Sequence, residues 1–152
     1  MMEQRIPLVV RRDIPAPRSL VFNAFTRADH MSRWFTPSAD ISVEVLEFDF
    51  ALNGAFRLRY AMPDGRGPVV SGTFERIKRP KCIVMSWTWQ APDPLENIPM
   101  RVRFEFFEKA DASEVVITHE GIPSDTACTV HVAGWEGTLR HLENFIQEDT
   151  DQ

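Results

Sequence analysis

Histidine and cysteine are the residue types in this chain best suited to metal binding or acid–base chemistry, and their spacing restricts both. The four histidines are His30, His119, His131 and His141. They are not paired at metal-site intervals, and a zinc or iron site would need three or four converging ligands. Cys82 and Cys128 are far apart and in no C-x-x-C pattern, so we interpret them as reduced thiols. The sequence therefore predicts no metal and no cofactor.

Motifs of the common enzyme classes do not occur. The segment 63–67 (PDGRG) lies between two predicted strands and opens no helix, so it is a hairpin turn and not a phosphate loop. Neither H-E-x-x-H nor a nucleophile elbow is present. Glu120 and Glu136 have no partner carboxylate at a spacing that supports paired acid–base catalysis. The catalytic residues, if any, stay unknown.

Two histidines are candidates for the interior. His119 follows the strand parity of Val115 and Ile117, and His131 lies one helical turn before Trp135. Either could act as an acid or base in a cavity. The alternative is a structural histidine with one satisfied partner, and this alternative stays open.

Aromatic residues dominate the apolar composition, with eleven Phe and four Trp against one Tyr. This balance fits a large dry core or the wall of an apolar cavity, and composition does not decide between them.

The hydrophobic periodicity predicts the elements that must position these side chains. Period-two patterns predict strands over 6–14, 41–48, 55–62, 69–76, 83–89, 101–106 and 114–120. Two short helices follow the first strand, the second starting at a capping-box spacing in 26–29. A long one-sided helix begins after Ser124 or Asp125. The sheet needs cover, and only this helix is large enough to supply it.

Strand parity then predicts which side chains face the helix. The predicted ligand-binding residues are Trp34, Phe35, Phe56, Leu58, Tyr60, Trp87, Trp89, Phe104, His119, His131, Trp135 and Leu139. Trp34 and Phe35 are expected at the cavity mouth. Strand residues of the opposite parity are predicted to face solvent. They are Arg57, Arg59, Arg101, Arg103 and Glu105.

Length and charge narrow the function classes. A chain of 152 residues fits one domain, 1–152, and its net charge of −5 argues against sequence-independent nucleic-acid binding. The first residues lack the apolar region of a signal peptide, and no apolar run is long enough to span a membrane. We therefore expect a cytoplasmic protein; its oligomeric state, a homodimer included, stays open.

An ordered series of short segments resembles one family. The segments are Ile14-Pro15-Ala16-Pro17, Val21-Phe22, Arg33-Trp34-Phe35, Asn53-Gly54-Ala55-Phe56-Arg57, Gly72-Thr73-Phe74-Glu75-Arg76-Ile77 with Pro80, Trp87-Thr88-Trp89, Thr118-His119-Glu120-Gly121 and Gly134-Trp135 with Leu139 and Leu142. They are similar to the Hsp90-ATPase-activator-homologue (AHSA1-like) branch of the START/Bet v 1-like (SRPBCC) superfamily. Asn53 stands where that pattern has its first glycine.

The resemblance implies an α+β helix-grip fold, in which a curved antiparallel sheet of six or seven strands surrounds a long C-terminal helix with a cavity between them. Relatives include carriers of hydrophobic ligands, polyketide cyclases and toxin-resistance proteins. Three functions follow as hypotheses: binding of a hydrophobic or aromatic small molecule, a cyclase- or hydratase-type enzyme using His119 or His131, and a co-chaperone-like interaction module using the arginine-rich sheet face. We rank them in that order.

Overall fold

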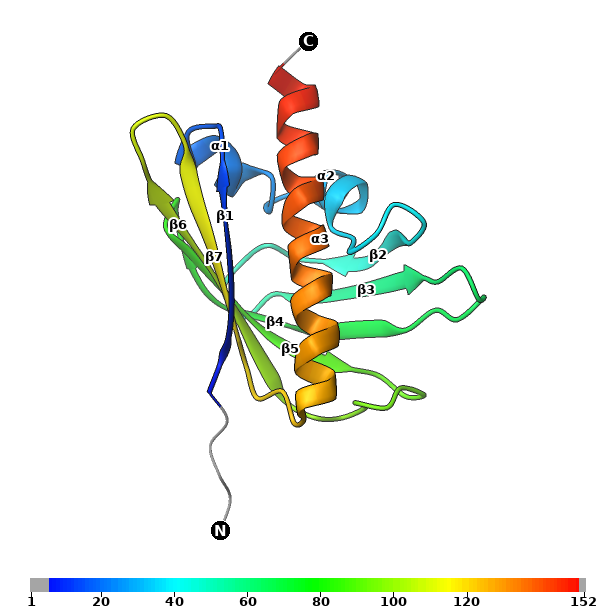
Figure 1. Cartoon of the computed structure of the whole chain (residues 1–152). Helices are drawn as coiled ribbons and strands as arrows, with labels where there is room; N and C mark the ends of the chain where they lie inside the picture. Colours follow the sequence, from blue (N-terminus) through cyan, green and yellow to red (C-terminus); the bar gives the residue numbers. More distant parts are fainter. Residues whose placement is uncertain (1–5, 151–152) are drawn as a thin grey trace.

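The computed structural model describes residues 6–150, which form seven strands and three helices (Figure 1). In chain order these are β1 (Leu8–Ile14), α1 (Arg18–Asn23), α2 (Ala28–Trp34), β2 (Ser42–Phe48), β3 (Ala55–Ala61), β4 (Val69–Lys78), β5 (Cys82–Trp89), β6 (Met100–Glu108), β7 (Ser113–Glu120) and α3 (Asp125–Thr150). The predicted order of elements is confirmed. No helix of the described part is both long and apolar enough to cross a membrane.

All seven strands belong to one antiparallel sheet in the order β1-β7-β6-β5-β4-β3-β2. The five hairpins from β2 to β7 form a meander. β1, the first strand of the chain, pairs with the last strand, β7, so that Leu8 lies opposite His119. Register shifts at Val45/Glu47 and Phe74/Arg76 mark irregularities that increase local twist. The sheet curves around α3, which crosses its concave side (Figure 1). The predicted helix-grip fold is confirmed.

Alternation along the strands separates a buried face from a charged one. In β3, Phe56 and Leu58 are buried while Arg57 and Arg59 are exposed. The exposed arginines pair with carboxylates of neighbouring strands, as in Arg59–Glu44 at 3.0 Å. This is the solvated face that parity predicts.

The start of α2 differs from the prediction. The capping box expected in 26–29 does not form, because the Thr26 hydroxyl donates to the carbonyl of Asn23. Asp29 instead accepts two hydrogen bonds from Arg27, the N-cap residue, whose side chain makes no capping bond. A local ion pair therefore replaces the reciprocal cap.

The beginning of α3 agrees with the prediction, since the Ser124 hydroxyl accepts the backbone N–H of Ala127 at 3.1 Å. Midway along this helix, Gly137 lies directly against the loop between α2 and β2. A Cβ at Gly137 would overlap the backbone carbonyl of Pro37, whereas a Cβ at Gly134 would come no nearer than 3.7 Å to the Pro37 ring. Gly137 thus permits the close approach of helix and loop.

Two alanine substitutions on the same helix should have opposite effects. We expect Gly137→Ala to lower the free energy of unfolding by about 1–3 kcal/mol, because the loop must move away from α3. Gly134→Ala should raise it by about 0.5–1 kcal/mol, because alanine favours the helix and fits there. Urea denaturation measures both values. Equal effects of the two substitutions would contradict the close contact at Gly137.

Candidate functional site

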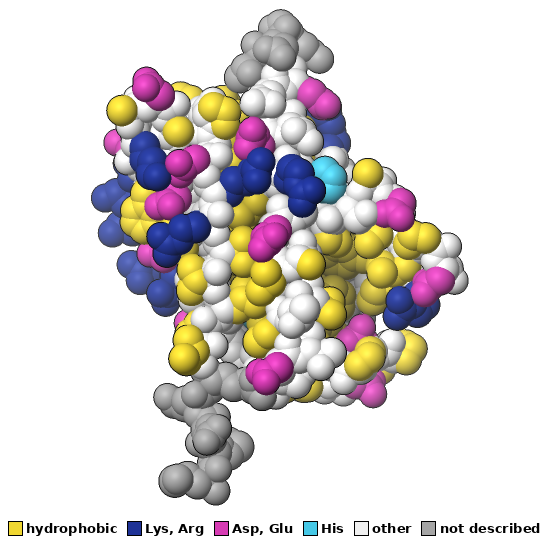
Figure 2. Space-filling view, in the orientation of Figure 1, with side chains coloured by type: hydrophobic (Ala, Val, Ile, Leu, Met, Phe, Trp, Pro, Cys, Tyr) yellow, Lys and Arg dark blue, Asp and Glu magenta, His cyan; other side chains and the backbone are white. Residues whose placement is uncertain are grey.

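A cavity of about 530 Å³ lies between the concave face of the sheet and the first half of α3. It is lined by Pro37, Ile41, Tyr60, Met62, Arg66, Pro68, Trp87, Trp89, Asp93, Pro94, Leu95, Ser124, Thr126, Ala127, Val130, His131, Gly134, Trp135 and Thr138. Figure 2 shows a hollow beside α3 whose walls are largely hydrophobic. Its size is within the range of about 300–1,000 Å³ of small-molecule sites.

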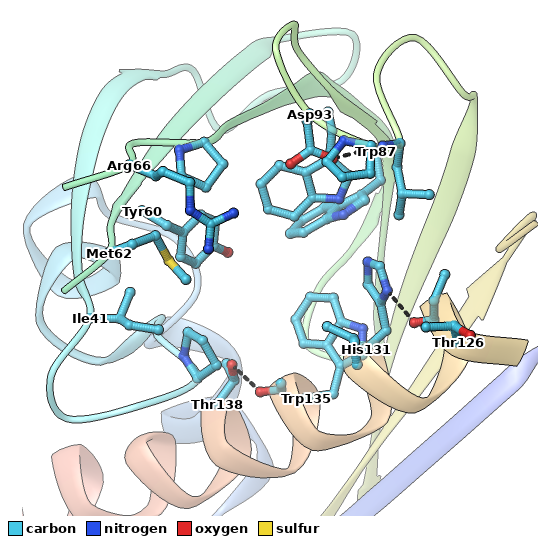
Figure 3. Close-up of a pocket in the computed structure, with 18 of the residues that line it drawn as sticks. Ile41, Tyr60, Met62, Arg66, Trp87, Asp93, Thr126, His131, Trp135 and Thr138 are labelled. Carbon is cyan, nitrogen blue, oxygen red and sulfur yellow. Dashed lines mark hydrogen bonds between the residues drawn. The ribbon is translucent and has the colours of Figure 1, made fainter. Parts of the chain in front are cut away.

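Four aromatic side chains form the inner wall (Figure 3). Trp87 and Trp89 project from the same face of β5, with ring centroids 6.0 Å apart and perpendicular planes. Tyr60 of β3 lies 5.6 Å from Trp89, and Trp135 of α3 lies 5.2 Å from Trp87. Flat apolar faces from two layers therefore surround one space, an arrangement suited to an aromatic guest.

His131 brings a polar nitrogen to this wall. Its Nδ1 lies 2.8 Å from the carbonyl oxygen of Ala127, one turn earlier in α3. Because a carbonyl only accepts, Nδ1 carries the proton of this bond, and Nε2 takes no part in it. Figure 3 shows the ring projecting from the helix into the cavity.

Behind the wall, His119 is held by Trp135. The indole N–H of Trp135 donates to His119 Nδ1 at 3.0 Å, and the ring of His131 lies 4.9 Å from that of His119. Burial, and secondarily the neighbouring His131, lowers the pKa of His119 to about 3. His119 is therefore neutral at physiological pH with its proton on Nε2, so it can donate a hydrogen bond but is a poor general base.

The rim of the cavity carries charges that already have partners. Arg66 Nε donates to Asp64 at 2.7 Å, and Asp93 accepts the backbone N–H of Leu95 at 2.8 Å. Within the cavity, burial raises the pKa of the Tyr60 phenol above its ordinary value, so it is a hydroxyl at neutral pH. The site thus combines an apolar interior with a rim whose charged side chains are already hydrogen-bonded.

The structure brings five of the twelve predicted ligand-binding residues to the cavity surface. These are Tyr60, Trp87, Trp89, His131 and Trp135. His119 lies behind them, hydrogen-bonded to Trp135. The other six, Trp34, Phe35, Phe56, Leu58, Phe104 and Leu139, belong to the packed core.

The expected position of Trp34 and Phe35 at the mouth is wrong, since each is only 1% exposed. The indole of Trp34 donates to the Ala24 carbonyl at 2.9 Å and its ring lies 4.7 Å from Phe25, which fixes α2 against α1. The mouth is formed instead by loop residues such as Arg66 and Asp93, which strand and helix periodicity does not detect. Among the side chains that the structure describes, no group of three metal-ligating residues comes together.

The comparisons with known proteins agree with this architecture. Residues 15–147 match the family model of the Activator of Hsp90 ATPase homolog 1-like protein. The chain belongs to this family, within the SRPBCC superfamily. The curated proteins contain no match to this AHSA1-like chain.

Solved structures share the fold at low sequence identity. The AHSA1 protein of Silicibacter pomeroyi is 19% identical with a TM-score of 0.81, covering 95% of this chain and 99% of that one. A Chromobacterium violaceum protein is 19% identical with a TM-score of 0.78, covering 92% and 96%. DynU16, from the dynemicin biosynthetic locus, is 15% identical with a TM-score of 0.71, covering 93% of this chain but 47% of its own. These likenesses establish the fold alone.

The buried neutral His119 predicts a specific pH dependence of stability. In the unfolded chain this histidine takes up a proton near pH 6.5, whereas in the folded protein it does so only near pH 3. Between these values the unfolded state binds more protons, so the free energy of unfolding falls as the pH drops, by up to about 1.4 kcal/mol per pH unit.

His119→Asn keeps an acceptor for Trp135 but does not titrate. We expect urea unfolding between pH 6.5 and pH 4 to show a shallower loss of stability in this variant, by about 1 kcal/mol per pH unit. The carboxylates contribute equally to both proteins, so the difference between the two slopes isolates His119. Parallel curves would show that His119 takes up its proton at the same pH in the folded and the unfolded protein, and would contradict the lowered pKa.

Proposed function

We propose that the protein binds a hydrophobic, aromatic small molecule in the cavity between the sheet and α3. The observation that carries this proposal is an open space of about 530 Å³ with Tyr60, Trp87, Trp89 and Trp135 on its wall. Tyr60, Trp87 and Trp135 also pack against the core, but each of them borders the cavity, whereas the core residues Phe56 and Phe104 do not line it.

Two other functions have less support from the site. An acid–base enzyme would depend on His131, because the Nδ1 of His119 is occupied by Trp135 and its pKa is far below neutrality. A docking surface on the arginine-rich face would use charges that already pair within the sheet, as Arg101 does with Glu75 at 2.8 Å. The accessible apolar cavity therefore favours ligand binding.

Filling the cavity from α3 should abolish binding without disturbing the core. A side chain at Gly134 projects into the cavity next to Pro37, so Gly134→Phe should occupy the ligand's place. We expect a thermal-shift screen of two- and three-ring aromatic compounds to give shifts of about 5–10 °C for the wild type at a hundredfold excess over Kd. The same compounds should not shift Gly134→Phe.

Two control variants make this screen specific. Gly134→Ala should respond like the wild type, because alanine leaves the cavity open. Phe107→Ala removes an exposed aromatic ring of β6, 46% accessible, and should also respond like the wild type. Shifts that persist in Gly134→Phe but disappear in Phe107→Ala would place binding on the outer surface and refute the proposal.

A further inference from the structure

Hydrogen-bond donors without acceptors gather at the aromatic wall. Trp87 lines the cavity and is 2% exposed, yet its indole N–H has no partner among the described residues. Tyr60 also lines the cavity (Figure 3), and burial alone, with no contribution from a hydrogen bond, raises the pKa of its phenol. An indole N–H can only donate, and burying it unpaired costs free energy unless an acceptor arrives.

His119 extends this set of donors behind the wall. Because its Nδ1 accepts from Trp135, its proton is on Nε2, and this buried nitrogen has no acceptor within the described part of the chain. The His119 ring lies 6.1 Å from that of Trp87. Two buried N–H groups without a described acceptor thus lie near the inner wall, and native structures rarely leave such groups unsatisfied.

The charges around the cavity indicate that the missing acceptor is neutral. Arg66, the one cation among the lining residues, is paired with Asp64, and Asp93 adds a carboxylate at the rim. An anion in this apolar space would give up its hydration without an unpaired lining arginine or lysine to compensate for it. A carbonyl oxygen accepts the same hydrogen bonds without carrying a charge.

We infer that the ligand of this cavity is a neutral aromatic compound with carbonyl oxygens, which accept hydrogen bonds from Tyr60 and Trp87. This inference rests on the proposed function and adds the chemical class of the ligand. The rings of the ligand contact Trp89 and Trp135, while its carbonyl faces the donors. The Trp87 nitrogen is buried in the described structure, so the inference requires its ring to turn toward the cavity when the ligand binds.

Two matched probes test the inference by isothermal titration calorimetry. Benzophenone and diphenylmethane differ only by a carbonyl in place of a methylene group, and diphenylacetate adds an anionic probe. We expect the ratio of the two neutral affinities to favour benzophenone more in the wild type than in Trp87→Phe or Tyr60→Phe. Each substitution should reduce the ratio about threefold to tenfold, the contribution of one neutral hydrogen bond. Tyr60→Phe removes only a hydroxyl, so the test holds even if Trp87→Phe is unstable.

A control variant and the contrary outcomes make the test decisive. Leu95→Ala removes apolar surface from the cavity and should weaken both neutral probes alike, leaving their ratio unchanged. An unchanged ratio in both donor variants, or tighter binding of diphenylacetate than of benzophenone, would overturn the carbonyl inference while cavity binding stands. Failure of all three probes to bind the wild type would count against the proposed function itself.

Discussion

Trp135 lies at the boundary between the packed core and the open cavity on the concave side of this sheet. Its ring lies 5.8 Å from Phe35 and 5.7 Å from Phe104, both core residues, and 5.2 Å from Trp87, which faces the cavity. Its N–H is anchored on His119 of β7. The second half of α3 packs against α2, where the ring of Phe145 lies 5.3 Å from that of His30. The first half of α3 borders the cavity.

The hydrogen bond from Trp135 also sets the chemistry of the space. It occupies the only lone pair of neutral His119, which leaves that histidine as a donor in a buried setting. Together with Trp87 and Tyr60, this makes a wall that is apolar in area but supplies donors to a guest. An apolar surface gives affinity through burial, and a few fixed donors give orientation. Within this site His119 is therefore a hydrogen-bond donor and a poor base.

The sequence could predict the fold because strand alternation and the start signal of the long helix pointed to the same architecture, although the capping box expected in 26–29 did not form. Period-two alternation in β3 and β6 separated buried rings from paired arginines, and Ser124 marked the start of α3. The cavity was only partly predictable. Strand parity shows which side of the sheet a side chain faces, but it does not show whether a helix or loop packs against that side chain. Phe56 and Trp87 share a face, yet only Trp87 meets open space. Arg66 and Asp93 reach the rim through loops whose paths depend on long-range closure. The buried position of Trp34 could not be predicted either, because it depends on a hydrogen bond from its indole N–H to the carbonyl of Ala24.

The four tryptophans offer the most direct test of where a ligand binds. Their settings differ: the indole N–H of Trp34 donates to Ala24 and that of Trp135 to His119, whereas the N–H of Trp87 has no partner among the described residues. The ring of Trp89 lines the cavity. A ¹⁵N–¹H spectrum of the wild type titrated with benzophenone should shift the indole resonances of Trp87, Trp89 and Trp135 and leave that of Trp34 in place. A shift confined to Trp34, or none at all under saturating ligand, would contradict a ligand site between the sheet and α3.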